Sequence, residues 1–154
     1  MTASAIMTAN PPTLREGESV AEAAAKLVAH RYAGLPVADA GGRFLGMFGI
    51  YDLLSLLVPR VALAGDLLPN LRFLGDDPSQ LRETYQSVKD KPVGQVCDRQ
   101  AVTLRPDTPL IEVVRLFCRN YAVLAVVEPE SGKIAGIVSS WDALAAIAGE
   151  GSRG

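Results

Sequence analysis

Histidine, cysteine and tryptophan are scarce in this chain of 154 residues, which has one histidine, two cysteines and one tryptophan. Cys97 and Cys118 lie outside any CxxC pair, and together with His30 they do not supply a zinc or haem ligand set. We therefore expect no metal site. We interpret both cysteines as reduced thiols that are packed in the interior.

Long apolar runs and a basic excess are also absent. The apolar stretches, such as 56–58 and 122–127, are far shorter than the ~20 residues that span a bilayer. The net charge is −2, whereas binding to nucleic acid or to a membrane surface usually requires a clustered basic excess. The N-terminus does not read as a secretory signal. We expect a cytoplasmic globular protein with no nucleic-acid partner and no membrane insertion.

The chain does contain an internal repeat. The segment 46–52, GMFGIYD, is echoed ninety positions later, by subtraction of the residue numbers, in the segment 136–142, GIVSSWD. A fixed internal period indicates a repeat architecture. Further matching pairs lie upstream at 6–8 and 96–98, 13–14 and 103–104, 20–23 and 110–113, and 32–39 and 121–128.

Each unit of the repeat reads as strand, helix, strand, strand and helix. In the first unit, apolar residues recur at helical spacing after Ser19, and glycines at 41–42 suit a hairpin turn. The predicted elements of the first unit are an extended segment ending at 13–14, a helix from Ser19, strands over 35–38 and 44–50, and a helix over 52–57.

The second unit follows the same plan. We expect Thr108 to cap a helix with Pro109 at its first position. Strands are predicted over 123–127 and 134–138. The last helix, 140–148, should stop at Gly149, which suits a helix C-terminus.

An insertion separates the units and divides the chain into 1–58, 59–91, 92–150 and a disordered tail at 151–154. Asp77 and the glutamine at 80 form a capping-box pattern, which predicts a helix of about ten residues with Leu81, Tyr85 and Val88 on its apolar side. The segment 61–74 is too apolar for a free linker. It should bury against its own domain or against a partner.

In this order and at these spacings, Ile-Met-Thr, Thr-Leu, Gly-Leu-Pro-Val-x-Asp and Gly-h-h-x-x-x-Asp resemble the CBS domain, named after cystathionine β-synthase. Two copies, over 4–57 and 92–148, resemble a CBS pair, or Bateman module. The resemblance implies an α/β (α+β) fold of tandem CBS domains, each β-α-β-β-α. It also implies pseudo-twofold packing with two clefts between the units, and a homodimer. It does not explain the helical insertion.

The resemblance implies a stand-alone regulatory module that binds AMP, ADP, ATP or S-adenosylmethionine in a cleft and modulates an unidentified partner protein. No cofactor is required. The sequence shows no nucleophile–base pair, metal set or glycine-rich phosphate loop, so we do not expect an enzyme. The alternative is a ligand-free interaction or scaffold module that docks through the inserted segment.

The resemblance assigns binding residues to each cleft. For the main cleft these are Asp142, Ser139, Ile137, Tyr32, Ala33, Pro12 and Met7. For the weaker cleft they are Asp52, Gly49, Met47, Tyr121, Ala122, Val102 and Cys97. In each cleft the aspartate would hold the ribose hydroxyls.

The residue three positions before each aspartate differs between the two units. Ser139 and Asp142 also form a capping-box pattern, and the two roles can coexist. Gly49 lacks the hydroxyl that Ser139 offers, so we expect the Asp142 cleft to bind more tightly.

Two further features bear on the ligand. CBS domains that sense nucleotides often carry basic residues before the Leu-Pro-Val strand, where this chain has alanine, glycine and valine. We interpret His30, Arg31 and Arg119 as surface charges, so a nucleoside, a monophosphate or S-adenosylmethionine fits at least as well as a polyphosphate. Tyr51 and Trp141 precede the two aspartates and would pack against the facing unit or a dimer partner, or stack on a base.

Overall fold

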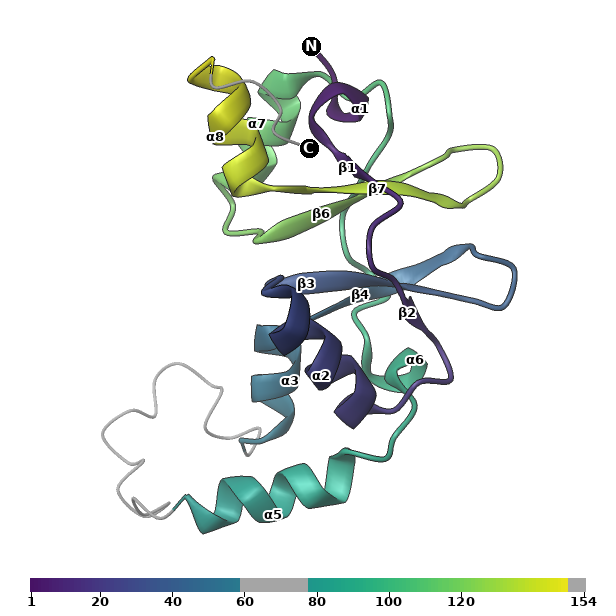
Figure 1. Ribbon diagram of the computed structural model, residues 1–154, viewed down its shortest axis with the longest axis vertical. Helices are drawn as coiled ribbons and strands as arrows, with labels where there is room; N and C mark the ends of the chain where they lie inside the picture. Colours follow the sequence, from purple (N-terminus) through teal and green to yellow (C-terminus); the bar gives the residue numbers. More distant parts are fainter. Residues whose placement is uncertain (59–77, 150–154) are drawn as a thin grey trace.

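The computed structural model describes residues 1–58 and 78–149, which form two α+β units with similar architecture. Each unit has a small sheet, and the two sheets face each other across the middle of the molecule (Figure 1). The helices lie on the outer sides of the sheets. The predicted fold class, with two related α+β units packed together, is therefore confirmed.

The first unit contains β2 (Leu14–Arg15), α2 (Val20–His30), β3 (Gly34–Ala38), β4 (Phe44–Gly49) and α3 (Ile50–Leu56). Strand β3 lies at the centre of its sheet, parallel to β2 and antiparallel to β4. A capping box starts α2, because Ser19 Oγ accepts a hydrogen bond from Glu22 N and Ser19 N donates to the Glu22 carboxylate. Gly42 takes a φ of 81° in the hairpin turn, as predicted.

The second unit contains β5 (Thr103–Leu104), α7 (Leu110–Phe117), β6 (Val123–Val127), β7 (Ile134–Ser139) and α8 (Ser140–Ile147). Its sheet has the order β1-β7-β6-β5, in which β1 (Thr8–Ala9) comes from the start of the chain. The predicted hairpins and helices of both units agree with these bounds to within two residues. Gly149, with a φ of 73°, follows the end of α8.

Some sequence predictions need correction. Thr108 does not cap α7: Pro109 stands at the cap position, and Thr108 Oγ1 instead accepts a hydrogen bond from Arg105 N at 2.9 Å. The hydroxyl therefore closes the preceding turn. Cys118 is exposed at the end of α7, so the prediction of two packed thiols is wrong for this cysteine.

The predicted helix of the insertion is present as α5 (Ser79–Val88). Its apolar side is only partly covered: Val88 is buried, whereas Leu81 is 44% exposed. The proposed cap residue Asp77 and the apolar segment 61–74 lie outside the described residues.

The first helix of each sequence repeat packs into the hydrophobic core of the other unit. The first core, with Leu35 and Phe48, includes Val93 from α6 (Val93–Val96). The second core, with Leu124 and Val138, includes Ala3 from α1 (Ala3–Ile6). Each repeat therefore completes the core of the other.

Backbone hydrogen bonds hold the exchanged helices in place. Val93 N donates to Glu18 O at 2.7 Å, and Ala3 N donates to Thr108 O at 2.8 Å. Gly94 approaches Glu16, the residue after β2, so closely that an added Cβ would lie 2.8 Å from Glu16 Cβ. Since these contacts join the two repeats, the structural units do not coincide with the sequence repeats.

Candidate functional site: a cavity between the two units

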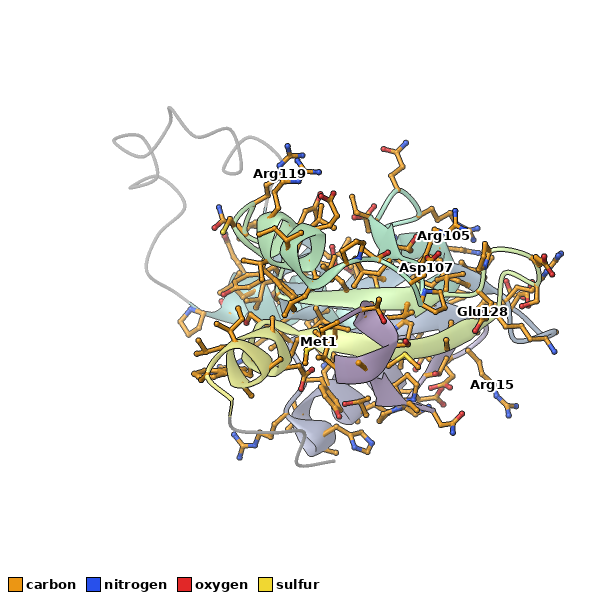
Figure 2. All side chains as sticks on the ribbon, turned by 90° about the horizontal axis from the view of Figure 1, so that it is seen from above. Met1, Arg15, Arg105, Asp107, Arg119 and Glu128 are labelled. Atoms are coloured by element: carbon orange, nitrogen blue, oxygen red, sulfur yellow. The ribbon has the colours of Figure 1, made fainter. Side chains whose placement is uncertain are left out.

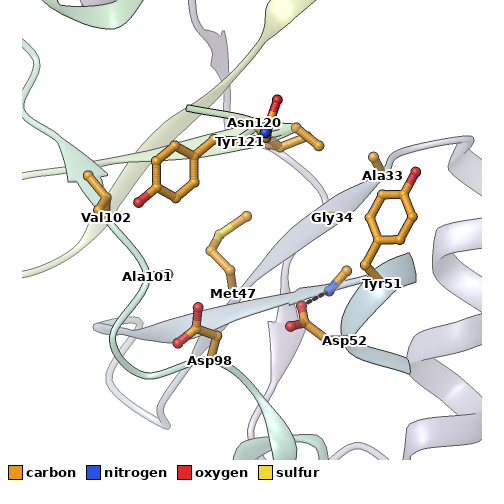
Figure 3. Close-up of a pocket in the computed structure, with 13 residues that line it drawn as sticks. Ala33, Gly34, Met47, Tyr51, Asp52, Asp98, Ala101, Val102, Asn120 and Tyr121 are labelled. Atoms are coloured by element: carbon orange, nitrogen blue, oxygen red, sulfur yellow. Dashed lines mark hydrogen bonds between the residues drawn. The ribbon is translucent and has the colours of Figure 1, made fainter. Parts of the chain in front are cut away.

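A cavity of about 210 Å³ lies between the two units on the side of Asp52 (Figure 3). Its walls come from the start of β3, the end of β4 with the start of α3, the segment 98–102, and the residues that lead into β6. The walls are mostly apolar, and they carry two carboxylates and no cationic side chain. The lining residues are Ala33, Gly34, Met47, Gly49, Tyr51, Asp52, Asp98, Ala101, Val102, Asn120, Tyr121, Ala122 and Val123.

Asp52 lies in the first turn of α3 and is half-buried. Its Oδ2 accepts a hydrogen bond from Gly49 N at 2.7 Å, and no described residue donates to its Oδ1. Burial raises the pKa of Asp52, the Gly49 N–H opposes this, and the charge of Asp98 raises the pKa further. The helix start therefore fixes the carboxylate at the cavity and leaves one oxygen for a ligand.

Gly49 is required by the close approach of two strands. Ile50 N donates to Ala33 O at 2.9 Å, which draws the start of β3 against the end of β4. A Cβ at Gly49 would lie 2.6 Å from Ala33 O, a distance that real Cβ atoms do not adopt. The absence of a side chain at this position therefore has a structural cause.

Asp142 occupies the equivalent position in the second unit, and its predicted capping box with Ser139 is confirmed. Ser139 N and Ser139 Oγ both donate to Asp142 Oδ2, at 2.7 and 2.9 Å, and Asp142 N donates to Ser139 Oγ at 3.2 Å. The serine hydroxyl that we expected to face a ligand is thus engaged with the aspartate.

The remaining residues predicted for the Asp142 cleft come from several elements of both units. Met7 and Ile137 are neighbours, because Thr8 pairs with Ile137 and Met7 packs against Gly136. Tyr32 packs against the first core, with its ring 6.3 Å from that of His30. Ala33 lines the Asp52 cavity, and Pro12 is partly buried. The binding role of this set stays a prediction.

The structure gathers six of the seven residues predicted for the weaker cleft around one cavity. The exception is Cys97, which packs against the first core and donates to Gly94 O at 3.7 Å. Burial raises the pKa of the Cys97 thiol, and the charge of Arg99 opposes this shift. Cys97 therefore packs against the first core as a protonated thiol and does not line the cavity.

Asp98 and Asn120 also line the cavity, although neither was predicted from the sequence. Asp98 was recognisable as a difference between the copies, because it stands where the first repeat has Thr8. His30, Arg31 and Arg119 do not line the cavity, and Figure 2 shows Arg119 at the outside of the molecule.

The aromatic residues that precede the two aspartates are not covered by the facing unit. Tyr51 is 76% exposed and Trp141 is 78% exposed. Tyr51 stands at the edge of the cavity (Figure 3). The two side chains therefore do not pack against the facing unit. Their predicted contacts with a base or with a dimer partner stay predictions.

Residues 1–58 and 78–149 contain no helix that is both long and apolar enough to cross a membrane. They also contain no group of three or more histidine, cysteine, aspartate or glutamate side chains that could hold a metal ion.

Solved structures of similar fold include ligand complexes. CBSX2 in complex with AMP has 25% sequence identity and a TM-score of 0.71, with 97% of each chain covered. The CBS-pair protein CBSX2 from Arabidopsis thaliana has 24% identity and a TM-score of 0.75, covering 97% of this chain and 95% of that one. A CBS domain pair in complex with 5′-methylthioadenosine and S-adenosyl-L-methionine has 20% identity and a TM-score of 0.66, covering 97% and 98%.

Sequence comparison agrees with the fold. No curated protein matches the sequence significantly. The family model of the CBS domain, in contrast, matches twice, over residues 3–59 and 93–149. These two matches cover more than half of the chain, which therefore belongs to the CBS domain family and carries two CBS domains in tandem.

Proposed function

We propose that this protein is a regulatory module that binds an adenosine compound in the Asp52 cavity and modulates a partner protein. The observation that carries the proposal is the geometry of Asp52. One carboxylate oxygen is held by the Gly49 N–H, and the other lies at the wall of a cavity between the units and receives no hydrogen bond from residues 1–58 or 78–149. A carboxylate in this arrangement accepts hydrogen bonds from the vicinal hydroxyls of a ribose.

The apolar part of the cavity suits a purine ring. Met47, Val102 and Tyr121 supply apolar or aromatic surface from both units, and polar groups in such a pocket usually fix the orientation of the ligand. The complex of CBSX2 with AMP supports an adenosine ligand in a protein of this fold. AMP, ADP, ATP and S-adenosylmethionine remain the candidates that the sequence predicted, and a cytoplasmic location stays a prediction.

Binding in this cavity would couple the two units. The cavity wall combines Asp52 and Met47 of the first unit with Tyr121 and Val102 of the second. A ligand that contacts both sides stabilises the arrangement of the units in which those contacts are made. A partner protein could detect this change in the relative stability of the arrangements.

Isothermal titration calorimetry with adenosine, AMP, ATP and S-adenosylmethionine tests the proposal. We expect Asp52→Ala to weaken binding at least about tenfold, since a hydrogen bond to a charged group contributes roughly 1.5–3 kcal/mol. Asp107→Ala is the matched control, because Asp107 is an exposed carboxylate that does not line the cavity. If none of these compounds binds at millimolar concentration, the proposal is wrong.

The second aspartate provides an internal comparison. If Asp142→Ala abolishes binding and Asp52→Ala does not, the ligand occupies the cleft that the sequence favoured. If both variants weaken binding in a titration with two sites, both clefts are functional.

One observation favours contact with another chain. Exposed apolar side chains gather on α3 and α8, which lie on the same side of the molecule in Figure 1. They are Ile50, Tyr51, Leu54, Trp141, Leu144 and Ile147. Apolar surface of this kind marks a contact with another chain. The homodimer predicted from the sequence would cover it.

A further inference from the structure

Asp98 is held at the edge of the Asp52 cavity by the opposite unit. Its backbone N donates to Met47 O at 2.8 Å, and its backbone O accepts from Met47 N at 3.0 Å. Asp98 Oδ1 accepts a hydrogen bond from Gln100 N at 3.0 Å, whereas no described residue donates to Oδ2. In Figure 3 the two aspartate side chains lie on the same side of the cavity, beneath Met47. The cavity therefore contains two fixed carboxylates.

No cation compensates for this second negative charge. Asp98 forms no salt bridge within the described part of the chain, and the cavity wall holds no lysine, arginine or histidine. The next residue, Arg99, points elsewhere, because its guanidinium donates to Gly94 O at 2.7 Å. The negative charge of Asp98 raises the pKa of the Asp52 carboxyl, in addition to the effect of burial.

The repeat provides a neutral counterpart to Asp98. Thr8 pairs with Ile137 in the second sheet, and ninety positions away by residue number Asp98 pairs with Met47 in the same way. At equivalent positions, one unit therefore has a hydroxyl and the other a carboxylate. At this pair of positions the two clefts differ by one negative charge, so we expect the position to influence the preference for ligand charge.

We propose that Asp98 sets the specificity of the Asp52 cavity, favouring adenosine ligands with a neutral or positively charged 5′ substituent over those with a 5′ phosphate. The inference rests on the proposed function, since it presupposes an adenosine compound at Asp52. A phosphate in a cavity of about 210 Å³ lies within the Debye length of ~10 Å from both carboxylates, so solvent ions screen the repulsion only in part. A sulfonium or ammonium group at the same place is attracted.

The experiment compares adenosine, AMP and S-adenosylmethionine as probes in an Asp142→Ala background, which isolates the Asp52 cavity. Affinities are measured by calorimetry at low ionic strength, where charge effects are largest. We expect adenosine and S-adenosylmethionine to bind more tightly than AMP. Asp98→Asn keeps the shape of the side chain and the acceptor for Gln100 N. It should raise the affinity for AMP relative to adenosine about two- to fivefold, because interactions of a solvent-exposed charge contribute little free energy.

The outcomes separate the two proposals. If no probe binds, the proposed function fails and the inference fails with it. If the probes bind but Asp98→Asn leaves the ratio of AMP to adenosine affinity unchanged, only the inference is wrong. Asp107→Asn serves as the control for net charge, and it should not change the ratio.

A converse variant keeps the inference testable if Asp98→Asn does not fold. In the Asp52→Ala background, Thr8→Asp places a carboxylate at the equivalent position of the other cleft. If that cleft binds the probes, the variant should lower its affinity for AMP relative to adenosine. An unchanged ratio there would contradict the assignment of charge selection to this position.

Discussion

Ser139 Oγ donates a hydrogen bond to Asp142 Oδ2 at 2.9 Å while it accepts one from Asp142 N at 3.2 Å. The hydroxyl therefore acts on the aspartate and on the helix amide. Ser139 would therefore affect a ligand indirectly, by fixing the orientation of the Asp142 side chain.

Removal of this hydroxyl should destabilise the fold. We expect Ser139→Ala to lower the free energy of unfolding by about 1 kcal/mol, the usual cost of losing an N-cap. Urea denaturation measures the loss. Ser87→Ala, at an exposed position in the last turn of α5, is the control and should have little effect. Equal stability of Ser139→Ala and the native protein would show that the capping box does not contribute.

Giving the first unit the serine of the second should not create a better site. Gly49→Ser places a Cβ 2.6 Å from Ala33 O, so β3 and β4 must separate at their ends. We expect a loss of roughly 1–3 kcal/mol in unfolding free energy, as is typical of overpacking. Gly17→Ser, where an added Cβ meets no atom within 4 Å, is the matched control. Tighter adenosine binding by a stable Gly49→Ser variant would contradict this expectation.

The raised pKa of Asp52 predicts a pH-dependent effect of its removal. Burial is the main cause, so the folded state holds the proton more tightly than the unfolded state does. Ionised Asp52 therefore lowers stability. This loss of stability is absent at pH values below the ordinary pKa of 3.8 and complete at pH values above the raised pKa. The stability of Asp52→Asn relative to the native protein should rise as the pH increases through this window.

Urea denaturation at several pH values tests the direction of this pH dependence. Glu112→Gln is a control for which the opposite direction is expected. The hydrogen bond from Arg115 lowers the pKa of Glu112, so ionised Glu112 adds stability that is lost as the pH falls through the lowered value. The relative stability of Glu112→Gln should therefore fall as the pH rises. A difference between Asp52→Asn and the native protein that does not vary with pH would disprove the effect of burial.

The two cysteines should react at different rates. Burial raises the pKa of Cys97 and restricts access to it, whereas Cys118 is exposed. With an aromatic disulfide reagent near neutral pH, we expect one fast thiol and one at least about tenfold slower. The Cys118→Ser variant should retain only the slow phase. A fast phase in that variant would show that Cys97 is accessible.

The apolar side chains of α3 and α8 predict self-association. Light scattering at micromolar concentrations should give the mass of a dimer, and Trp141→Glu should shift it toward the monomer because a charge cannot be buried unpaired at such a contact. Leu81→Glu on α5, at the opposite end of the molecule from α8 in Figure 1, should leave the mass unchanged. A monomeric mass for the native protein would rule out the homodimer.

Much of the fold could be predicted because its signals are local. The strand pairs at 34–49 and 123–139 follow from apolar runs around glycines, and Gly42 and Gly132 do take positive φ values of 81° and 72°. The capping box at Ser139 is likewise set by four consecutive residues. The exchange of α1 and α6 was not predictable, because a four-residue helix carries no signal for the core on which it packs.

The site was only partly predictable for the same reason. Asp52 and Met47 could be placed from their motif, whereas Asp98 resembles a surface residue until its backbone pairing with Met47 brings it to the cavity. Gly49 looked like a lost contact in the sequence. Only the position of Ala33 O shows why a side chain is excluded there.

The exchanged helices α1 and α6 make the two repeats interdependent in folding. Fragments 1–58 and 78–149, prepared separately, would each carry the helix that closes the other's core and lack the one that closes its own. We expect each fragment alone to be largely unfolded, and an equimolar mixture to assemble. The whole chain should then unfold in one transition by heat or denaturant. A sequence that divides into two domains thus forms one thermodynamic unit.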